Sequence, residues 1–328
     1  MSTALVDGFG RQVRDLRISI TDRCNFRCGY CMPEEGMVWQ PRDELLTYEE
    51  IERVARVCVD RWGFESIRIT GGEPTVRAHL PLLVSKLAAL GVDVAMTTNG
   101  ASMGLLAADL RAAGLSRVNI SLDSLRRERF FAITRRDSLD RVLDGVAASV
   151  AAGFDPVKVN VVLLRGVNDD EIVDLAAFGR SSGVVVRFIE FMPLDAQGEW
   201  SSARVVPSAE VVDTVSAAFP LEPVDQRGSA PAERWRYADG AGEIGVISSV
   251  TKSFCGSCDR VRLTADGQFR NCLFAVDETD LRAVLRSGGS DDDLAAAMAG
   301  NVATKWAGHS INRVEFVRPN RSMSQIGG

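Results

Sequence analysis

The sequence predicts an α/β fold: an incomplete parallel (β/α)6 barrel of the TIM-like kind, with a C-terminal extension that closes its open side. Three observations predict it. Short β-branched runs alternate with helix-like stretches along the first two-thirds of the chain, which is typical of parallel strands with right-handed crossovers. Polar residues recur at every second position within several of these runs. The short sequence motifs follow the strands, where barrels build their sites.

Six strands are expected from the β-branched runs, at residues 16–20, 66–70, 92–97, 117–122, 157–164 and 184–191. The clearest helix begins with the capping box Thr47-Tyr48-Glu49-Glu50 and runs to about Trp62. Four further helices are expected between the other strands, at residues 80–90, 103–113, 139–152 and 170–182.

The period-two polar residues favour a barrel over an open, doubly wound sheet. Helices must cover one face of a parallel sheet, so that face is apolar. The polar members then share the other face, which is too polar for a second helix layer and suits a barrel interior that holds a polar ligand. They are Arg17, Ser19, Thr21, Arg68, Thr70, Asn119, Ser121, Lys158 and Asn160.

The pattern changes after Pro193, so we expect a partial barrel in residues 1–193 and an extension in residues 194–328. A Pro/Gly/charge-rich stretch follows the first helix of the extension, and a hairpin turns at Asp266-Gly267. The polar tail at the end of the chain is expected to be mobile in isolation. The other elements expected here are helices at 208–219, 281–286 and 292–300, short strands around 245–250, and hairpin strands within 260–274.

Composition is that of a soluble globular protein, with 46% hydrophobic and 25% charged residues among 328. A net charge of −6 gives no attraction to nucleic acid or to anionic membranes. No apolar run approaches the roughly 18 residues that span a bilayer. The first residues contain no apolar export segment, so we expect reduced cysteines and a cytoplasmic location.

Six of the seven cysteines form two triplets, Cys24-x3-Cys28-x2-Cys31 and Cys255-x2-Cys258-x13-Cys272. Three soft thiolates at such spacings favour a metal–sulfur cluster. A four-iron cluster and a zinc ion both need four ligands, so each triplet leaves one position free for a small molecule.

Disulfides and structural zinc are the alternatives. Disulfides need an oxidising compartment, and neither His79 nor His309 lies near a triplet in the sequence to complete a zinc site. Structural zinc is a stronger alternative for the second triplet than for the first, because a CxxC knuckle often binds zinc. The seventh cysteine, Cys58, lies on the apolar face of the first helix and is expected in the core.

The first triplet and the motif Gly71-Gly72-Glu73-Pro74 resemble the radical S-adenosylmethionine (SAM) superfamily, whose signature CxxxCxxC has an aromatic residue, here Tyr30, before its third cysteine. Within it, the whole chain resembles the GTP 3′,8-cyclase family of molybdenum cofactor biosynthesis. The matching motifs are Leu16-Arg17-Ile18-Ser19, Arg68-x-Thr70, Thr97-Thr98-Asn99-Gly100, Lys158-Val159-Asn160, Arg187-Phe188-Ile189-Glu190, the second triplet with Arg260 and Arg262, and the terminal Gly327-Gly328.

The resemblance implies two [4Fe-4S] clusters facing each other across the barrel cavity. It implies that a 5′-deoxyadenosyl radical from SAM removes the 3′ hydrogen of the GTP ribose, after which carbon 3′ attacks carbon 8 of guanine. The three cysteines of each triplet would bind a cluster, and the Gly-Gly tail would reach into the cavity. Tyr30, Gly72, Ser121 and Met192 would contact SAM. Arg17, Arg68, Thr97, Lys158, Arg260, Val261 and Arg262 would contact GTP.

The cationic residues support a GTP site independently of the resemblance. The sequence contains no Gly-x4-Gly-Lys-Ser/Thr loop, so side-chain cations must hold any triphosphate. Arginine suits this role because its planar fork binds phosphate oxygens in pairs. Five cations are placed in strands that aim them inward, namely Arg17, Arg68, Lys158, Arg260 and Arg262.

Two other functions stay open on the residues alone. One is a different radical SAM enzyme with an auxiliary cluster, such as a peptide-modifying enzyme. The other is a non-catalytic iron–sulfur or zinc scaffold, or an electron carrier. For the cyclase, the implied partners are GTP, a flavodoxin- or ferredoxin-like electron donor, and the next pathway enzyme, cyclic pyranopterin monophosphate synthase. Homodimer formation is left open, and no nucleic acid or membrane partner is expected.

Overall fold

The computed structural model describes residues 4–33, 35–195, 198–225, 227–311 and 316–327. One twelve-stranded sheet runs through them in the order β12-β11-β10-β1-β2-β3-β4-β5-β6-β9-β8-β7. Its middle is the six predicted strands, adjacent in chain order and parallel. Their bounds are β1 Asp15–Ser19, β2 Ser66–Thr70, β3 Asp93–Thr98, β4 Arg117–Ser121, β5 Val157–Leu163 and β6 Val185–Glu190.

The extension adds strands at both edges of this sheet. Strand β9 (Glu243–Ile247) pairs parallel to β6, and β10 (Arg260–Leu263) pairs parallel to β1. Outside them lie four antiparallel strands: β8 Glu233–Tyr237 and β7 Leu221–Val224 beyond β9, and β11 Gln268–Arg270 and β12 Thr279–Asp280 beyond β10. Strands from both sides of residue 193 therefore share one sheet, and the division into two domains stays a prediction.

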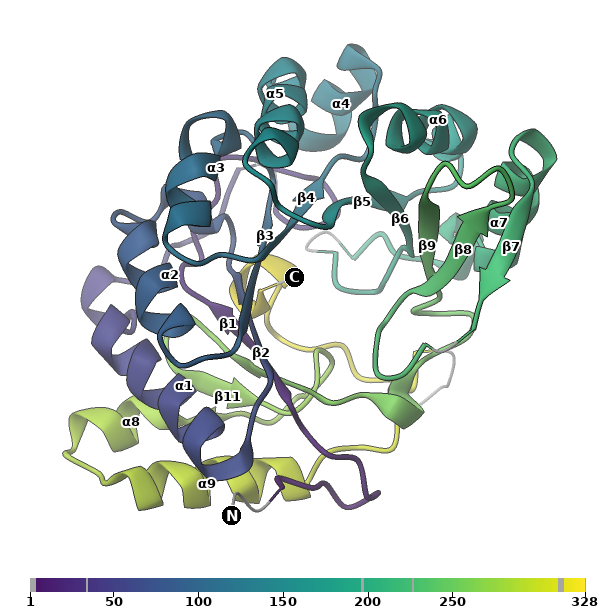
Figure 1. The fold of residues 1–328 in the computed structure, drawn as a ribbon. Helices are drawn as coiled ribbons and strands as arrows, with labels where there is room; N and C mark the ends of the chain where they lie inside the picture. The colour runs from purple at the N-terminus through teal and green to yellow at the C-terminus, as the bar shows by residue number, and fades with distance from the viewer. Residues whose placement is uncertain (1–3, 34, 196–197, 226, 312–315, 328) are drawn as a thin grey trace.

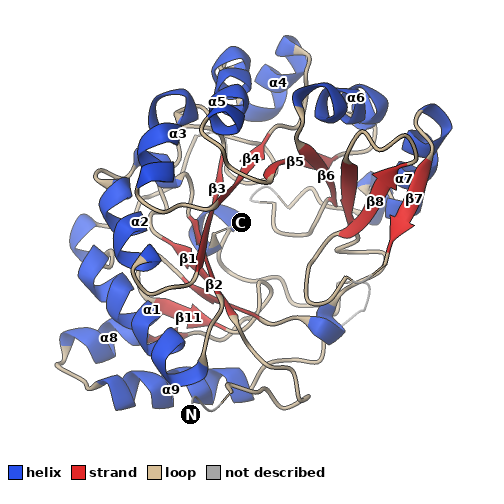
Figure 2. Cartoon of the chain, viewed as in Figure 1, coloured by secondary structure: helices blue, strands red, loops and turns tan. Residues whose placement is uncertain are grey.

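The principal helices lie outside the curved sheet, and the inner face surrounds the C-terminal end of the chain (Figure 1). This one-sided cover agrees with the predicted choice of a curved sheet over a doubly wound one (Figure 2). Within the described ranges, no helix is long and apolar enough to cross a bilayer. The helices are α1 Tyr48–Trp62, α2 Leu80–Ala88, α3 Met103–Ala112, α4 Arg127–Thr134, α5 Leu139–Ala151, α6 Ile172–Ser182, α7 Ser208–Ala218, α8 Leu281–Arg286, α9 Asp291–Ala303 and α10 Met323–Ile326.

Helix α1 begins at the predicted capping box. The Glu50 amide donates to Thr47 Oγ1 at 3.1 Å, and the Thr47 amide donates to Glu50 Oε2 at 2.7 Å. The helix ends at Gly63, whose φ of 67° is the left-handed conformation that glycine adopts without strain. Cys58 is only 1% exposed on the buried face, so its prediction as a core residue is confirmed.

Two elements in the connecting regions were not predicted. The charge-rich stretch 220–242 contains the hairpin of β7 and β8, in which only Tyr237 is fully buried, so no apolar run reveals it. Helix α4 was not expected, because only Phe130, Ile133 and Thr134 of its eight residues are buried. The hairpin at Asp266-Gly267 is confirmed, with Arg262 opposite Arg270.

The end of the tail is buried in the folded chain, and its mobility in isolation stays a prediction. Helix α10 begins with a capping box at Ser322, and Ser324 and Ile326 are each 1% exposed. The end of the chain lies at the centre of the molecule, inside the curve of the sheet (Figure 1). The described end of the tail therefore packs inside the sheet rather than on the molecular surface.

Candidate active site

Two cavities lie on the inner face of the sheet. The larger has a volume of about 380 Å³ and is lined by the second cysteine triplet. The smaller has a volume of about 200 Å³ and is lined by the first triplet. The wall between them is shared, because five residues line both cavities: Thr97, Asn160, Ile189, Met192 and Met323. The structure thus brings the two triplets, far apart in the sequence, to neighbouring hollows.

The glycines after β2 let that turn pack directly on the first cysteine loop. The Gly72 amide donates to the Thr21 carbonyl at 2.7 Å. A Cβ on Gly72 would lie 2.5 Å from the carbonyl oxygens of both Asp22 and Arg23, which no side chain tolerates. The lack of side chains at Gly71 and Gly72 therefore makes room for the chain that leads into the cysteine loop.

Buried polar contacts fix the same loop from its other side. The Glu73 carboxylate accepts hydrogen bonds from Thr98 Oγ1 at 2.7 Å and from the Asn99 amide at 2.6 Å. Asn99 Nδ2 then donates to Asn25 Oδ1, next to Cys24, at 2.7 Å. The ends of β2 and β3 and the cysteine loop therefore form one connected unit.

The thiols of the first triplet form no disulfide, and their burial opposes ionisation. Burial raises the pKa of Cys24 to about 11 and that of Cys31 to about 12, the latter despite hydrogen bonds from Ser324. Burial also raises the pKa of Cys28 well above its ordinary value. Because the thiolate is the form that binds metal, cluster assembly here must release protons.

All four residues expected to contact SAM line the smaller cavity: Tyr30, Gly72, Ser121 and Met192. Tyr30 is held there by its hydroxyl, which donates to Asp123 Oδ2 at 2.6 Å. Burial raises the pKa of Asp123 to about 6. Asp123 in turn accepts from the Val162 amide at 2.8 Å, so Tyr30 is anchored to β5.

The second triplet has a different electrostatic setting and a neighbour that the sequence did not reveal. Burial acts to raise the pKa of Cys255, but hydrogen bonds from His309 outweigh it and lower the value to about 7. The fold therefore brings His309, which is distant from the triplet in the sequence, to Cys255. Burial is likewise outweighed at Cys258, where Arg260 and Lys305 lower the pKa, whereas burial raises that of Cys272.

The donor sets fit iron–sulfur clusters with an open position. Each triplet offers three free thiols that line a cavity, and the first has Gly71 and Gly72 packed beside it. Across the described residues, no three His, Cys, Asp or Glu side chains are arranged to hold a single metal ion. The three free thiols of each triplet are the candidate cluster ligands.

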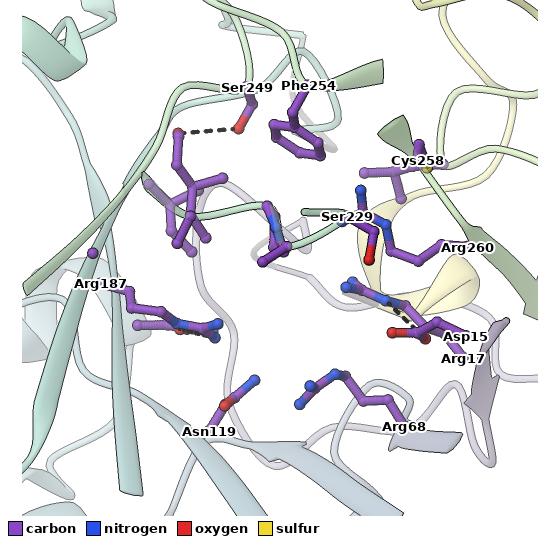
Figure 3. A pocket seen from close by; sticks show the side chains of 18 of the residues that line it. Asp15, Arg17, Arg68, Asn119, Arg187, Ser229, Ser249, Phe254, Cys258 and Arg260 are labelled. Carbon is purple, nitrogen blue, oxygen red and sulfur yellow. Dashed lines mark hydrogen bonds and ion pairs between the residues drawn. The ribbon is translucent and has the colours of Figure 1, made fainter. Parts of the chain in front are cut away.

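The larger cavity is strongly cationic. Among the described residues, eight lysines and arginines line it against three aspartates and glutamates, an excess of five positive charges. Figure 3 shows Arg17, Arg68, Arg187 and Arg260 reaching toward one hollow from different elements. Such an excess in a cavity favours a ligand with several negative charges.

Strand register places three of these arginines side by side in a row. Arg17 on β1 lies between Arg262 on β10 and Arg68 on β2. Farther along the sheet, Asn160 on β5 lies beside Arg187 on β6. Because alternate residues of a strand share a face, the row confirms the period-two pattern.

The like charges of these cations repel one another, and few carboxylates lie among them to offset the repulsion. Burial, then Arg17, lowers the pKa of Arg68 to about 10; burial, then Arg68, lowers that of Arg187 to about 9. Burial, then Arg187, lowers the pKa of Lys158 to about 8. A polyanion would relieve this repulsion and raise these pKa values again.

Hydrogen-bond donors in the cavity are left over for a ligand. Arg17 Nε, Arg68 Nε and Arg260 Nη2 are buried without a hydrogen-bond partner among the described atoms. Arg187 is held in place instead, with Nε and Nη2 donating to Asn160 Oδ1 at 2.9 and 2.6 Å. Arg187 is therefore oriented by an amide, which does not neutralise its guanidinium charge.

The residues predicted to contact GTP do not all lie in the same place, and their contact with GTP stays a prediction. Six of the seven residues line the larger cavity: Arg17, Arg68, Thr97, Lys158, Arg260 and Arg262. Val261 does not, because its side chain is 0% exposed within the hydrophobic core. Arg187 was not included among the GTP contacts, although an arginine inside the apolar strand β6 was the signal that could have found it.

The tail lies between the two cavities. Arg262 Nη1 donates to the Gly327 carbonyl, and Met323 lines both hollows. A Cβ on Gly327 would lie 2.7 Å from Thr70 Cγ2, so glycine is needed for this approach. Gly328, the other residue of the expected Gly-Gly tail, lies outside the described residues.

Comparison with known proteins places this geometry in a family. Residues 18–179 match the Radical SAM superfamily model, and residues 184–311 match Molybdenum Cofactor Synthesis C. The chain is 49% identical to the GTP 3′,8-cyclase of Streptomyces coelicolor, covering 99% of this chain and 96% of that one. It is 47% identical to the GTP 3′,8-cyclase of Corynebacterium glutamicum, with 99% and 89% covered.

The chain belongs to the GTP 3′,8-cyclase family. This membership confirms the resemblance drawn from the motifs. It also makes the chain a radical SAM enzyme rather than a scaffold or an electron carrier.

Solved structures share the fold at much lower identity. Streptococcus suis SuiB bound to S-adenosylmethionine matches with a TM-score of 0.60 at 14% identity, covering 88% of this chain and 68% of that one. SuiB bound to its precursor peptide SuiA gives 0.61, also at 14% identity, with 89% and 67% covered. At this identity the likeness shows the fold alone, so the GTP 3′,8-cyclase relatives carry the functional argument.

Proposed function

We propose that this chain converts GTP to (8S)-3′,8-cyclo-7,8-dihydroguanosine 5′-triphosphate, the first step of molybdenum cofactor biosynthesis. The observation that carries the proposal is the cation-lined cavity between two cysteine triplets. A triphosphate supplies the several negative charges that the excess of arginine and lysine calls for. The relatives named GTP 3′,8-cyclase support the same substrate.

The first triplet would hold one [4Fe-4S] cluster, and the second triplet would hold another. When bound, the first cluster and SAM supply the one-electron chemistry that removes the 3′ hydrogen of the ribose. Tyr30, Gly72 and Ser121 would orient SAM in the smaller cavity. Met192 lines both cavities and would separate SAM from GTP while keeping them adjacent.

The chain's own cations would bind and orient the nucleotide. Arg17 and Arg68 lie side by side on neighbouring strands with unused Nε donors, and they would hold phosphate oxygens. Lys158 would add charge from the other side of the cavity. The second triplet at the far wall would leave its cluster's open position facing the guanine base.

The partners and location beyond GTP follow from the same proposal. A low-potential donor of the flavodoxin or ferredoxin type would reduce the cluster, and cyclic pyranopterin monophosphate synthase would take the product. Homodimer formation is compatible with this chemistry. The seven free thiols suit a reducing compartment such as the cytoplasm.

Arg17→Ala is expected to weaken GTP binding by roughly ten- to hundredfold, because a hydrogen bond to a charged group contributes about 1.5–3 kcal/mol. Equilibrium dialysis with the reconstituted protein measures this. The matched control is Arg14→Ala, since Arg14 Nη1 contacts Glu65 at 3.1 Å at the surface. Equal GTP affinity of Arg17→Ala and the parent would remove Arg17 from the site.

A further inference from the structure

A buried lysine bridges two of the three chain segments that carry the second triplet. Lys305 is 4% exposed, and its Nζ donates to the Arg260 carbonyl at 2.6 Å and to the Asn271 carbonyl at 2.6 Å. Arg260 follows Cys258 by two residues, and Asn271 directly precedes Cys272. The same Nζ lies 3.8 Å from Cys258 Sγ. One ammonium group thus fixes the spacing between the CxxC turn and the third cysteine.

The remaining cysteine, Cys255, is held by Arg11 and by the residues that follow Lys305. Arg11 Nη1 donates to the Cys255 carbonyl at 2.6 Å and to the Ala307 carbonyl at 2.9 Å. His309 contacts Cys255 itself. A Cβ on Gly308 would lie 3.2 Å from Cys255 Cβ, so the chain passes close to the triplet here. Residues 305–309 therefore pack against the chain around all three cysteines of the second triplet.

The charge of Lys305 needs an anion that the protein alone does not provide. Among the described residues, its Nζ has two carbonyls and a sulfur as partners and no carboxylate. A buried, uncompensated ammonium is costly, and the cost falls when an anion lies beside it. Three thiolates and the cluster they bind would be that anion.

We propose that Lys305 is a positioning residue for the second triplet, whose buried ammonium holds the cysteine segments in place and makes the auxiliary cluster easier to reduce. The inference rests on the proposed second cluster. It goes beyond that proposal by assigning the cluster's assembly and potential to a side chain that is neither a ligand nor a GTP contact. A fixed positive charge near the cluster stabilises its reduced, more negative state.

The test isolates the auxiliary cluster in full-length protein that carries C24A/C28A/C31A. In this background we would compare Lys305 with K305M, which removes both charge and donors, and with K305R, which keeps the charge. R282M is the matched control, because Arg282 Nη1 also donates to a carbonyl, that of Glu44, at 2.7 Å but ties no cysteine. Iron content, the EPR spectrum of the reduced cluster and its midpoint potential are measured after anaerobic reconstitution.

K305M is expected to retain less than half the iron of its parent. Its remaining cluster should have a reduction equilibrium constant at least tenfold lower, which is about 59 mV for one electron. K305R and R282M should stay near the parent potential. If K305M fails to fold, K305Q tests the same point, because its amide still donates to a carbonyl while the charge is gone.

Two contrary results are distinguishable. Unchanged iron content and potential in K305M or K305Q would overturn the role of Lys305 and leave the second cluster intact. A background protein that binds no iron at all with Lys305 present would overturn the second cluster, and the role of Lys305 with it. SAM cleavage by the chain with an intact first triplet would survive either result.

Discussion

Cys28→Ala will reduce SAM cleavage to the level of a protein-free control. The first triplet offers only three thiols, and a four-iron cluster that leaves one iron open for SAM needs all of them. Cys28 lines the smaller cavity beside Gly72 and Tyr30, where SAM is proposed to bind. The measurement is 5′-deoxyadenosine released by anaerobically reconstituted protein with dithionite and SAM.

The matched control for this prediction is Cys58→Ala. Cys58 is a buried cysteine of helix α1 whose Sγ lies 3.8 Å from Met298 Sδ, and it lines neither cavity. Its loss is expected to cost about 0.5–3 kcal/mol of stability and to leave cleavage intact. Parent-level cleavage by Cys28→Ala would remove the first triplet from the chemistry.

Cys255→Ala will end GTP cyclisation while sparing much of the SAM cleavage. The second triplet lines the larger, cationic cavity and not the smaller one, so its loss leaves the SAM site in place. If the second triplet holds a cluster that binds guanine, as proposed, the base would lose this contact and the ribose would no longer be held for cyclisation. The measurement follows GTP consumption and 5′-deoxyadenosine in the same reaction.

Iron analysis separates this outcome from general unfolding. Bound iron should fall from about eight to about four per chain, as expected when one of two four-iron clusters is lost. Cys58→Ala should keep about eight. Cyclised product formed by Cys255→Ala at the parent rate would show that the second triplet is not part of the active site.

Local signals in the sequence predicted the six central strands and the helices that follow most of them. β-branched runs such as Val157–Leu163 and the capping box at Thr47 each determine an element within a few residues. The inward row of cations was also predictable, because Arg17 and Arg68 interrupt apolar strands at matching positions. Period and residue type were sufficient for these features.

Contacts between distant segments could not be predicted in this way. His309 contacts Cys255, and Lys305 contacts Cys258, only because the chain after helix α9 folds back toward the second triplet. The edge strands β7 and β8 bury too little surface to leave an apolar pattern. The tail reads as polar, yet Ile326 is buried by the inner face of the sheet.

The glycines after β2 also have a structural role that the sequence did not reveal. Their motif was recognisable in the sequence, but the reason for Gly72 includes the main chain of Asp22 and Arg23, which occupies the space a Cβ would need. A residue can therefore be assigned to a site correctly while its physical role stays hidden until the neighbouring loop is placed.

The most direct test of the account is anaerobic turnover of the reconstituted protein with SAM and dithionite, with and without GTP, and with ATP for comparison. The cyclase account predicts that GTP raises 5′-deoxyadenosine release and is consumed to a 3′,8-cyclised nucleotide, whereas ATP is not. SAM cleavage that is indifferent to GTP, with GTP recovered unchanged, would contradict it.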